Sequence, residues 1–113
     1  MSDNDTEMKT ILADRGRTYG AYADNAHLTQ RFKKLLRDAP NFHQMPDYMR
    51  EGFEMTLHKI ARAANGDPTH RDNVVDAIGY LKLVLEEMDR EAAQFQRSKD
   101  EFNKAMNITN AQS

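Results

Sequence analysis

The chain has 113 residues, a length that fits one domain and leaves too little material for two separate hydrophobic cores. Its 16 Lys and Arg residues against 18 Asp and Glu residues give a net charge of -2, without the basic excess of proteins that collect nucleic acid or anionic membranes. The hydrophobic content of 39% and the mean hydropathy of -0.86 are low for a compact monomer. Either much of the surface is solvated helix, or a partner buries part of it.

The absence of cysteine excludes disulfides, thiol nucleophiles and thiolate metal sites, and it is compatible with a reducing compartment. No apolar run approaches the roughly 20 residues that are needed to cross a bilayer. Residues 1–7 are acidic and polar, whereas a signal peptide is basic and then apolar. We therefore expect a cytoplasmic protein without a membrane partner.

Apolar residues recur at helical spacing and no segment alternates as a half-buried strand does, so the sequence predicts an all-α fold. A first helix is expected over about residues 6–14, with a stop near Gly16, and a second over about 24–38. A loop with two prolines follows. A third helix is expected over about 47–65, where Asn65 and Gly66 form a C-terminal stop.

A long fourth helix is predicted to start near Asp72 and to continue for roughly 35 residues, about 52 Å. Its apolar positions are separated by alternating steps of four and three, which is the heptad pattern of a coiled coil, interrupted only by Lys99. These positions are Val74, Ile78, Leu81, Leu85, Met88, Ala92, Phe95, Lys99, Phe102 and Met106.

The distal half of this helix, after about Arg90, has no segment of matching length to pack on. We therefore expect a homo-oligomer, a dimer, in which this arm packs on a second copy of the chain; the alternative is an arm that frays in solution. The predicted organisation is a helical domain over residues 1–90 and a C-terminal helical arm over residues 91–113, with a polar and loose tail from about Asn107.

On a helical wheel, the third helix separates an apolar side from a polar side. The same holds for the start of the fourth helix, where Asp72, Asp76 and Gly79 lie opposite the apolar residues. We expect the two apolar sides to pack together and the acids to gather around a shared cleft. The apolar residues are Met49, Phe53, Leu57, Ile60 and Ala64 in the third helix and Val74, Ile78, Leu81 and Leu85 in the fourth.

Carboxylates around one cleft favour Mg²⁺, which prefers carboxylate and water oxygens and bridges substrate phosphates. The predicted metal ligands are Glu51, Glu54, Asp72 and Asp76, and Glu54 and Asp76 are the predicted catalytic pair. The predicted phosphate partners are His58, Lys59, Arg62 and His70. The alternative is a solvated helix surface with i,i+4 pairs, such as Glu54 with His58.

Residues 15–25 combine turn formers, arginine and tyrosine. Arg17 offers a planar fork for phosphate, Tyr19 can stack on a base, and Asn25 can cap a helix whose N-terminus is open to an anion. In the alternative interpretation the tyrosines cover the edge of the core and Arg17 pairs with an acid of the fourth helix. Nucleic-acid binding is a weaker hypothesis that rests on a local basic patch, which we expect to be a solvated face: Arg15, Arg17, Arg31, Lys33, Lys34 and Arg37.

Several short motifs resemble a small bacteriophage-encoded helical family of unassigned function, over about residues 11–85. These motifs are Arg17-x-Tyr19-Gly20, Asp24-Asn25-Ala26, His58-Lys59-x-x-Arg62 and Gly66-Asp67-Pro68-x-His70-x-Asp72-x-x-x-Asp76-x-x-Gly79-Tyr80. More distantly, the order of acidic helix, turn and acidic helix is similar to the MazG-like all-α nucleoside triphosphate pyrophosphatases. That resemblance implies a four-helix arrangement, acids that bind Mg²⁺, and dimers or higher oligomers.

In the MazG-like comparison, Glu51 or Glu54 stands for the first acidic pair and Asn73-x-x-Asp76 for the Glu-x-x-Asp of the family. The chain departs from the pattern at His58, where another acid is expected, and at Asn73, which replaces a glutamate. Fewer carboxylates neutralise less metal charge. We therefore expect a protein that binds a nucleotide or another phosphorylated small molecule and hydrolyses it with Mg²⁺, or that binds without hydrolysis. The alternative is a non-enzymatic protein that docks on a host protein.

Overall fold

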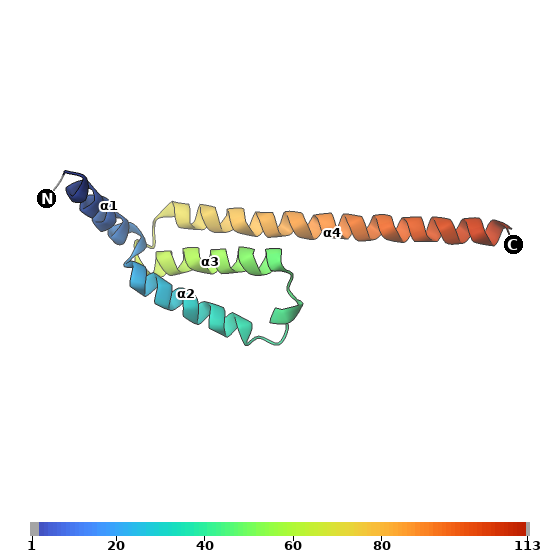
Figure 1. The fold of residues 1–113 in the computed structure, drawn as a ribbon, viewed down its shortest axis with the longest axis horizontal. Helices are drawn as coiled ribbons and strands as arrows, with labels where there is room; N and C mark the ends of the chain where they lie inside the picture. Colours follow the sequence, from blue (N-terminus) through green and yellow to red (C-terminus); the bar gives the residue numbers. More distant parts are fainter. Residues whose placement is uncertain (1–2, 113) are drawn as a thin grey trace.

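The computed structural model describes the backbone of residues 3–112 and the side chains of residues 3–107. This part of the chain is built of helices and contains no strand, which confirms the all-α prediction (Figure 1). In chain order the elements are α1 (Asp3–Tyr19), α2 (Tyr22–Arg37), the short 3₁₀ helix η1 (Phe42–Gln44), α3 (Asp47–Asn65) and α4 (Arg71–Gln112).

The bounds of α3 agree with the prediction, whereas α1 and α4 are longer than predicted. The predicted stop near Gly16 is wrong: α1 continues to Tyr19 and ends where Gly20 turns the chain with a φ of 83°. α4 has 42 residues and stays helical to Gln112, beyond the predicted start of a loose tail near Asn107. A helix of that length spans about 63 Å.

α3 is the central helix, with α2 on one side and α4 on the other (Figure 1). Gly52 meets α4 so closely that a Cβ at this position would clash with Val84. Ala61 is fully buried and comes nine residues later, which is half a turn further round the helix. α3 therefore buries two opposite faces, unlike the one-sided helix that the sequence predicts.

The predicted packing of apolar side against apolar side is wrong for α4. Ile78 is 61% exposed, and the other heptad positions of α4 are exposed as well. We call these heptad positions, from Val74 to Met106, the α4 stripe. The side of α4 that meets α3 begins one residue earlier, with Asn73 and Val84 buried. The physical reason is that α3 is covered on two faces, so its apolar edge, which includes the exposed Ile60, lies beside the contact with α4 instead of in it.

The hydrophobic core of the described residues is small. Its buried apolar side chains are Phe42, Ala61 and Val84. A compact monomer of this mass exposes about 6,300 Å² of surface, whereas the chain exposes 8817 Å². The radius of gyration is 22.6 Å, against about 13 Å for a compact domain of this length.

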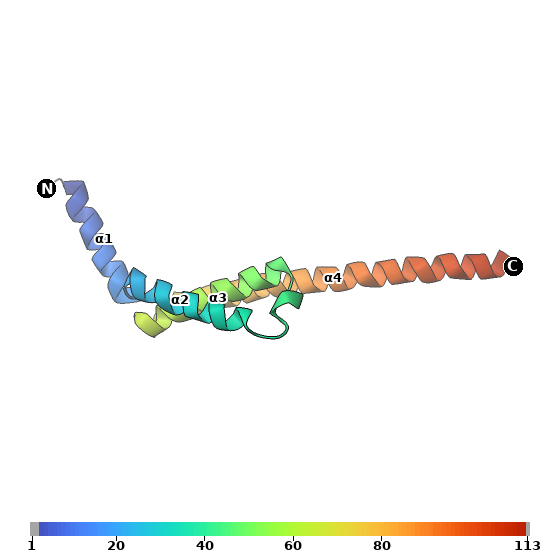
Figure 2. The same cartoon turned by 60° about the horizontal axis from the view of Figure 1, so that its bottom comes forward.

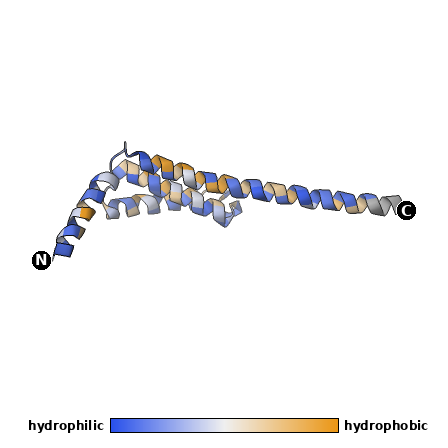
Figure 3. Cartoon of the chain, turned by 90° about the horizontal axis from the view of Figure 1, so that it is seen from above, coloured by the Kyte–Doolittle hydropathy of each residue, from blue (hydrophilic) through white to orange (hydrophobic). Residues whose placement is uncertain are grey.

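The excess surface belongs mainly to the arm of α4 and to α1. Tyr48 donates a hydrogen bond of 3.0 Å to Glu91 Oε2, and every described side chain of α4 beyond this point is exposed. Figure 2 shows α1 leaving the bundle at one end and the arm of α4 projecting from the other. Figure 3 shows hydrophobic residues concentrated where α4 runs beside α3 and mixed with hydrophilic ones along the arm. None of the described helices combines the length and the apolarity that a membrane span requires.

Candidate functional site

The turn between α1 and α2 packs directly on the turn between α3 and α4. The backbone amide of Asp67 donates a hydrogen bond of 2.8 Å to the carbonyl oxygen of Thr18. A Cβ on Gly66 would clash with this same carbonyl, and one on Gly20 would lie 2.6 Å from the carbonyl oxygen of Asn65. Both glycines are needed for this close approach of two backbones, which brings the motif residues of the two turns to one corner of the molecule.

Tyr19 lies at the centre of this corner. Its hydroxyl is 3.3 Å from Nε2 of His70, and the two rings meet edge to face at 5.2 Å. The guanidinium groups of Arg62 and Arg15 lie over the Tyr19 ring at 4.8 and 5.3 Å from its centroid. Cation–π attraction and the ring contact therefore hold basic groups from α1, α3 and the α3–α4 turn around one side chain.

Asn25 fixes the backbone of the corner. Its Nδ2 donates a hydrogen bond of 2.6 Å to the carbonyl oxygen of Tyr19, and its Oδ1 accepts one of 3.0 Å from Nδ2 of Asn65. Asn25 is predicted from the sequence to bind a ligand. In the structure this buried amide ties the start of α2 to the ends of α1 and α3.

Two adjacent cavities open at the corner and share Tyr22, Asn25 and Arg62. The first, of about 410 Å³, lies against α1 and includes Arg15 and Tyr19; the second, of about 200 Å³, lies between α2 and α3 and includes Thr29, Lys33 and His58. Their combined lining contains arginine, lysine and histidine but no aspartate or glutamate. Ala21, the N-cap of α2, lines the first cavity and makes no side-chain cap, so the positive end of the helix dipole is available there.

The basic groups around the second cavity affect the pKa of His58, which lines it. The pKa of His58 is lowered from 6.5, first by burial and then by the positive charges of Arg62, Lys59 and Lys33. Thr29 is buried, and its hydroxyl has no hydrogen-bond partner. The cavity thus offers positive charge beside a buried hydroxyl that has no partner.

The corner collects part of the predicted phosphate-binding set. Tyr19, Asn25, His58, Arg62 and His70 lie there. Arg17 and Lys59 do not line either cavity. The exposed Arg17 pairs with Asp14 of its own helix, and not with an acid of α4, while Lys59 Nζ lies 3.0 Å from Asp76 Oδ2 on the other face of α3.

The predicted metal ligands do not meet in one place. Asp76 is paired with Lys59, Asp72 is exposed with its Oδ2 3.7 Å from His70 Nε2, and Glu51 lines a different cleft beside Tyr80 and Glu87. Glu54 follows Gly52 by two residues, which turns it about 200° away from the face that meets α4. Within residues 3–107 no group of three or more His, Cys, Asp or Glu side chains is placed to hold a metal. Within a single chain the four acids therefore lie apart from one another.

Thr29 and Lys33 are not among the site residues predicted from the sequence. A signal was present, because Asn25, Thr29 and Lys33 follow one another at i,i+4 spacing and so share one face of α2. This face of α2 was not predicted to form part of the site, because nothing in the sequence shows that it packs next to the polar face of α3.

The fold and the corner define a small all-helical protein with a basic, aromatic-lined cavity and a projecting helical arm. The chain belongs to the family of the domain of unknown function DUF6378, whose model matches residues 5–88. The match includes α1, α2, α3 and the part of α4 beside α3, and it ends before the arm. No curated protein and no solved structure matches the chain.

Proposed function

We propose that the corner binds a nucleotide or another small molecule that carries phosphate. The observation that carries the proposal is the lining of the two cavities, which brings Arg15, Lys33 and Arg62 together without a carboxylate. Arginine forks and the open N-terminus of α2 suit phosphate oxygens. Tyr22, which is 87% exposed at the mouth of both cavities, offers an aromatic face on which a base can stack.

Hydrolysis of a bound nucleoside triphosphate is a separate part of the proposal. The MazG-like resemblance implies cleavage with Mg²⁺ by Glu54 and Asp76, but these acids lie on different sides of α3. We therefore place binding first and treat cleavage as a separate measurement. We also propose that the protein works as a homodimer in the cytoplasm of a cell that hosts a phage, in keeping with the resemblance and with the large exposed surface.

Isothermal titration calorimetry tests the binding proposal. Inorganic pyrophosphate, a nucleoside monophosphate and each nucleoside triphosphate are titrated into the protein with and without Mg²⁺. Arg62→Gln and Lys33→Gln are each expected to weaken binding by about tenfold or more, because each removes a charge-assisted hydrogen bond. Arg97→Gln is the matched control: Arg97 is exposed on the arm and far from the corner, so its loss leaves affinity unchanged. Absence of binding to every phosphate compound refutes the proposal.

Release of pyrophosphate from a nucleoside triphosphate in the presence of Mg²⁺ tests the hydrolytic part. If the protein cleaves the substrate, Asp76→Ala and Glu54→Ala should each reduce the rate while Arg97→Gln does not. Binding without release of pyrophosphate leaves the protein as a nucleotide-binding protein.

A second candidate function is docking on a host protein, and one observation favours it. Phe95 is 71% exposed, and Phe102 and Met106 on the same arm are exposed as well. In this alternative, Phe95→Asp abolishes capture of a host protein from a lysate, while Arg62→Gln leaves it intact. A lysate from which the arm captures nothing specific contradicts it.

A further inference from the structure

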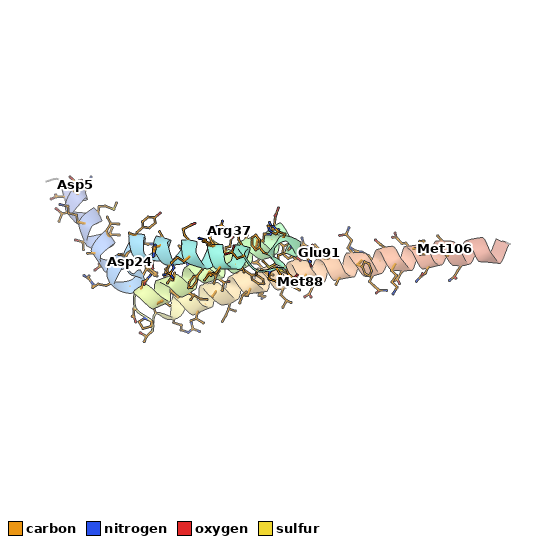
Figure 4. All side chains as sticks on the ribbon, turned by 90° about the horizontal axis from the view of Figure 1, so that it is seen from below. Asp5, Asp24, Arg37, Met88, Glu91 and Met106 are labelled. Carbon is orange, nitrogen blue, oxygen red and sulfur yellow. The ribbon has the colours of Figure 1, made fainter. Side chains whose placement is uncertain are left out.

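The α4 stripe is an uncovered coiled-coil seam that runs the length of the helix. Apart from Ala92 and Lys99, its residues are apolar and large, and all of them are exposed. The chain exposes about 2,500 Å² more than a compact monomer of its mass. This excess lies mainly on α4 and α1, and a standard interface buries about 800 Å² on each partner, so burial of about a third of the excess is enough for a stable dimer. Figure 4 shows the stripe residues Met88 and Met106 far apart along the helix, one near Glu91 and the other on the arm.

We propose that a second copy of the chain covers this stripe with its α4 antiparallel, so that each arm lies along the domain of the other protomer. This inference rests on the homodimer included in the proposed function. A parallel, in-register pair would bring Lys99 against the partner's Lys99 inside the seam and leave the small Ala92 against the partner's Ala92. Like charges in a buried seam are costly, and paired small residues leave a void.

One antiparallel register also places opposite charges next to each other beside the seam. When Leu85 lies opposite the partner's Met88, Lys82 lies next to the partner's Asp89, and the twofold symmetry repeats the pair. Lys82 and Asp89 are exposed, and neither has an ion-pair partner in its own protomer among the described residues. The same register places Phe95 of each arm on the partner's Ile78 and sets large side chains against the partner's Ala92.

The antiparallel register also separates the two copies of Lys99. In the register that pairs Leu85 with the partner's Met88, Lys99 lies opposite the partner's Val74, near the end of the pair. The two ammonium groups therefore stay far apart, and each can remain in contact with water.

Disulfide trapping tests orientation and register, since the chain contains no cysteine of its own. The double variant Ile78→Cys/Phe95→Cys should form a disulfide-linked dimer under mild oxidation, because position 78 faces the partner's position 95. Each single variant should stay unlinked, although a mixture of the two should link. Linkage of each single variant to itself shows a parallel pair and overturns the inference while leaving the homodimer. A monomer by analytical ultracentrifugation at all concentrations overturns both.

A charge swap provides a second test with exposed residues that do not affect the fold of a protomer. Asp89→Lys should weaken dimerisation about tenfold, and Lys82→Asp added to it should restore dimerisation. A spin label at Lys104→Cys should give a distance above about 50 Å, because the two sites lie at opposite ends of the pair. A short distance at this position, or no rescue by the second charge change, contradicts the antiparallel register. Phosphate binding at the corner is measured separately and survives either failure.

Discussion

Tyr19 determines how the basic residues of the corner are arranged. Its ring contacts the guanidinium groups of Arg15 and Arg62 and the imidazole of His70, and its backbone carbonyl accepts the hydrogen bond from Asn25. Positive groups that would otherwise repel one another and separate are all held in contact with the side chain of Tyr19. An anion that enters the cavities therefore meets charge that is already in place, which lowers the entropic cost of binding.

The titration of His58 reports whether an anion occupies the second cavity. Burial and neighbouring positive charges lower the pKa of His58 in the folded chain, so the unfolded chain binds more protons between that lowered value and 6.5. Stability consequently falls as the pH falls through this range. A bound anion offsets the repulsion and raises the pKa. In an NMR titration we expect the pKa of His58 to be higher in sulfate than in chloride. In Arg62→Gln we expect the same pKa in the two salts. A pKa of His58 in the original chain that does not depend on sulfate contradicts the site.

The two glycines at the corner are expected to be the least replaceable in the chain. Gly66→Ala drives a Cβ into the carbonyl oxygen of Thr18, and Gly20→Ala adds a close contact at a positive φ. Each should lower the free energy of unfolding by about 2 kcal/mol or more. Gly79→Ala is the control, because a Cβ there meets nothing within 4 Å and the helix gains about 1 kcal/mol. Urea denaturation measures all three, and equal effects at Gly66 and Gly79 would contradict the packing of the turns.

At the scale of the element, α3 organises the molecule by burying opposite faces against α2 and α4. Small residues mark both contacts, with Gly52 towards α4 and Ala61 on the opposite face. Because the approach at Gly52 leaves no space for a Cβ beside Val84, the distance between α3 and α4 depends on this pair of residues.

A double-mutant cycle tests that dependence. Gly52→Ala should destabilise the protein by about 1–3 kcal/mol because it overpacks the contact with Val84. Val84→Ala alone leaves a void and is also destabilising. The double variant should be more stable than the sum of the two effects by about 1 kcal/mol. Strict additivity in urea denaturation would mean that the two residues do not share a contact.

Periodicity was enough to predict the four α-helices, although η1 lies in a segment that was predicted as a loop, and the pair Asn65 and Gly66 marked the end of α3. Periodicity did not predict which faces of the helices pack on each other. α4 carries two seams that are offset by one residue: Asn73 and Val84 belong to the one that α3 covers, and Val74 and Leu85 belong to the more apolar one that α3 leaves bare. A helical wheel favours the more apolar seam, because it has no information on whether the partner is in the same chain. The acids were assigned to a shared cleft for the same reason.

The candidate site was predictable in part. Tyr19, His58, Arg62 and His70 follow from the motif pattern, because their residue types suit phosphate. The contact between the two turns was not predictable, since it depends on backbone approach at Gly20 and Gly66 over a long sequence separation. Without knowledge of that contact, the spacing of Lys33 and Thr29 indicates only an ordinary solvated helix surface.

At the scale of the whole molecule, the structure is an elongated body of 85 × 32 × 26 Å, and the corner and the arm of one chain lie at its opposite ends. The residues proposed to bind phosphate lie on α1, α2 and α3, whereas the proposed seam lies on α4. We therefore expect binding and dimerisation to be separable. We expect Phe95→Asp/Phe102→Asp to be monomeric in analytical ultracentrifugation, because two charges are placed in the seam, and to keep the pyrophosphate affinity of the original chain. A parallel loss of both properties would contradict this separation.

The central claim is that the corner of α1, α2 and α3 binds phosphate, and amide chemical shifts measured during a titration with pyrophosphate test it most directly. We expect a saturable change at Tyr22, Thr29, Lys33 and Arg62, with the amides of residues 84–95 unmoved, because these residues lie far from the corner both in one chain and in the antiparallel pair. Changes confined to the arm, or spread evenly over all lysines and arginines without saturation, would contradict it.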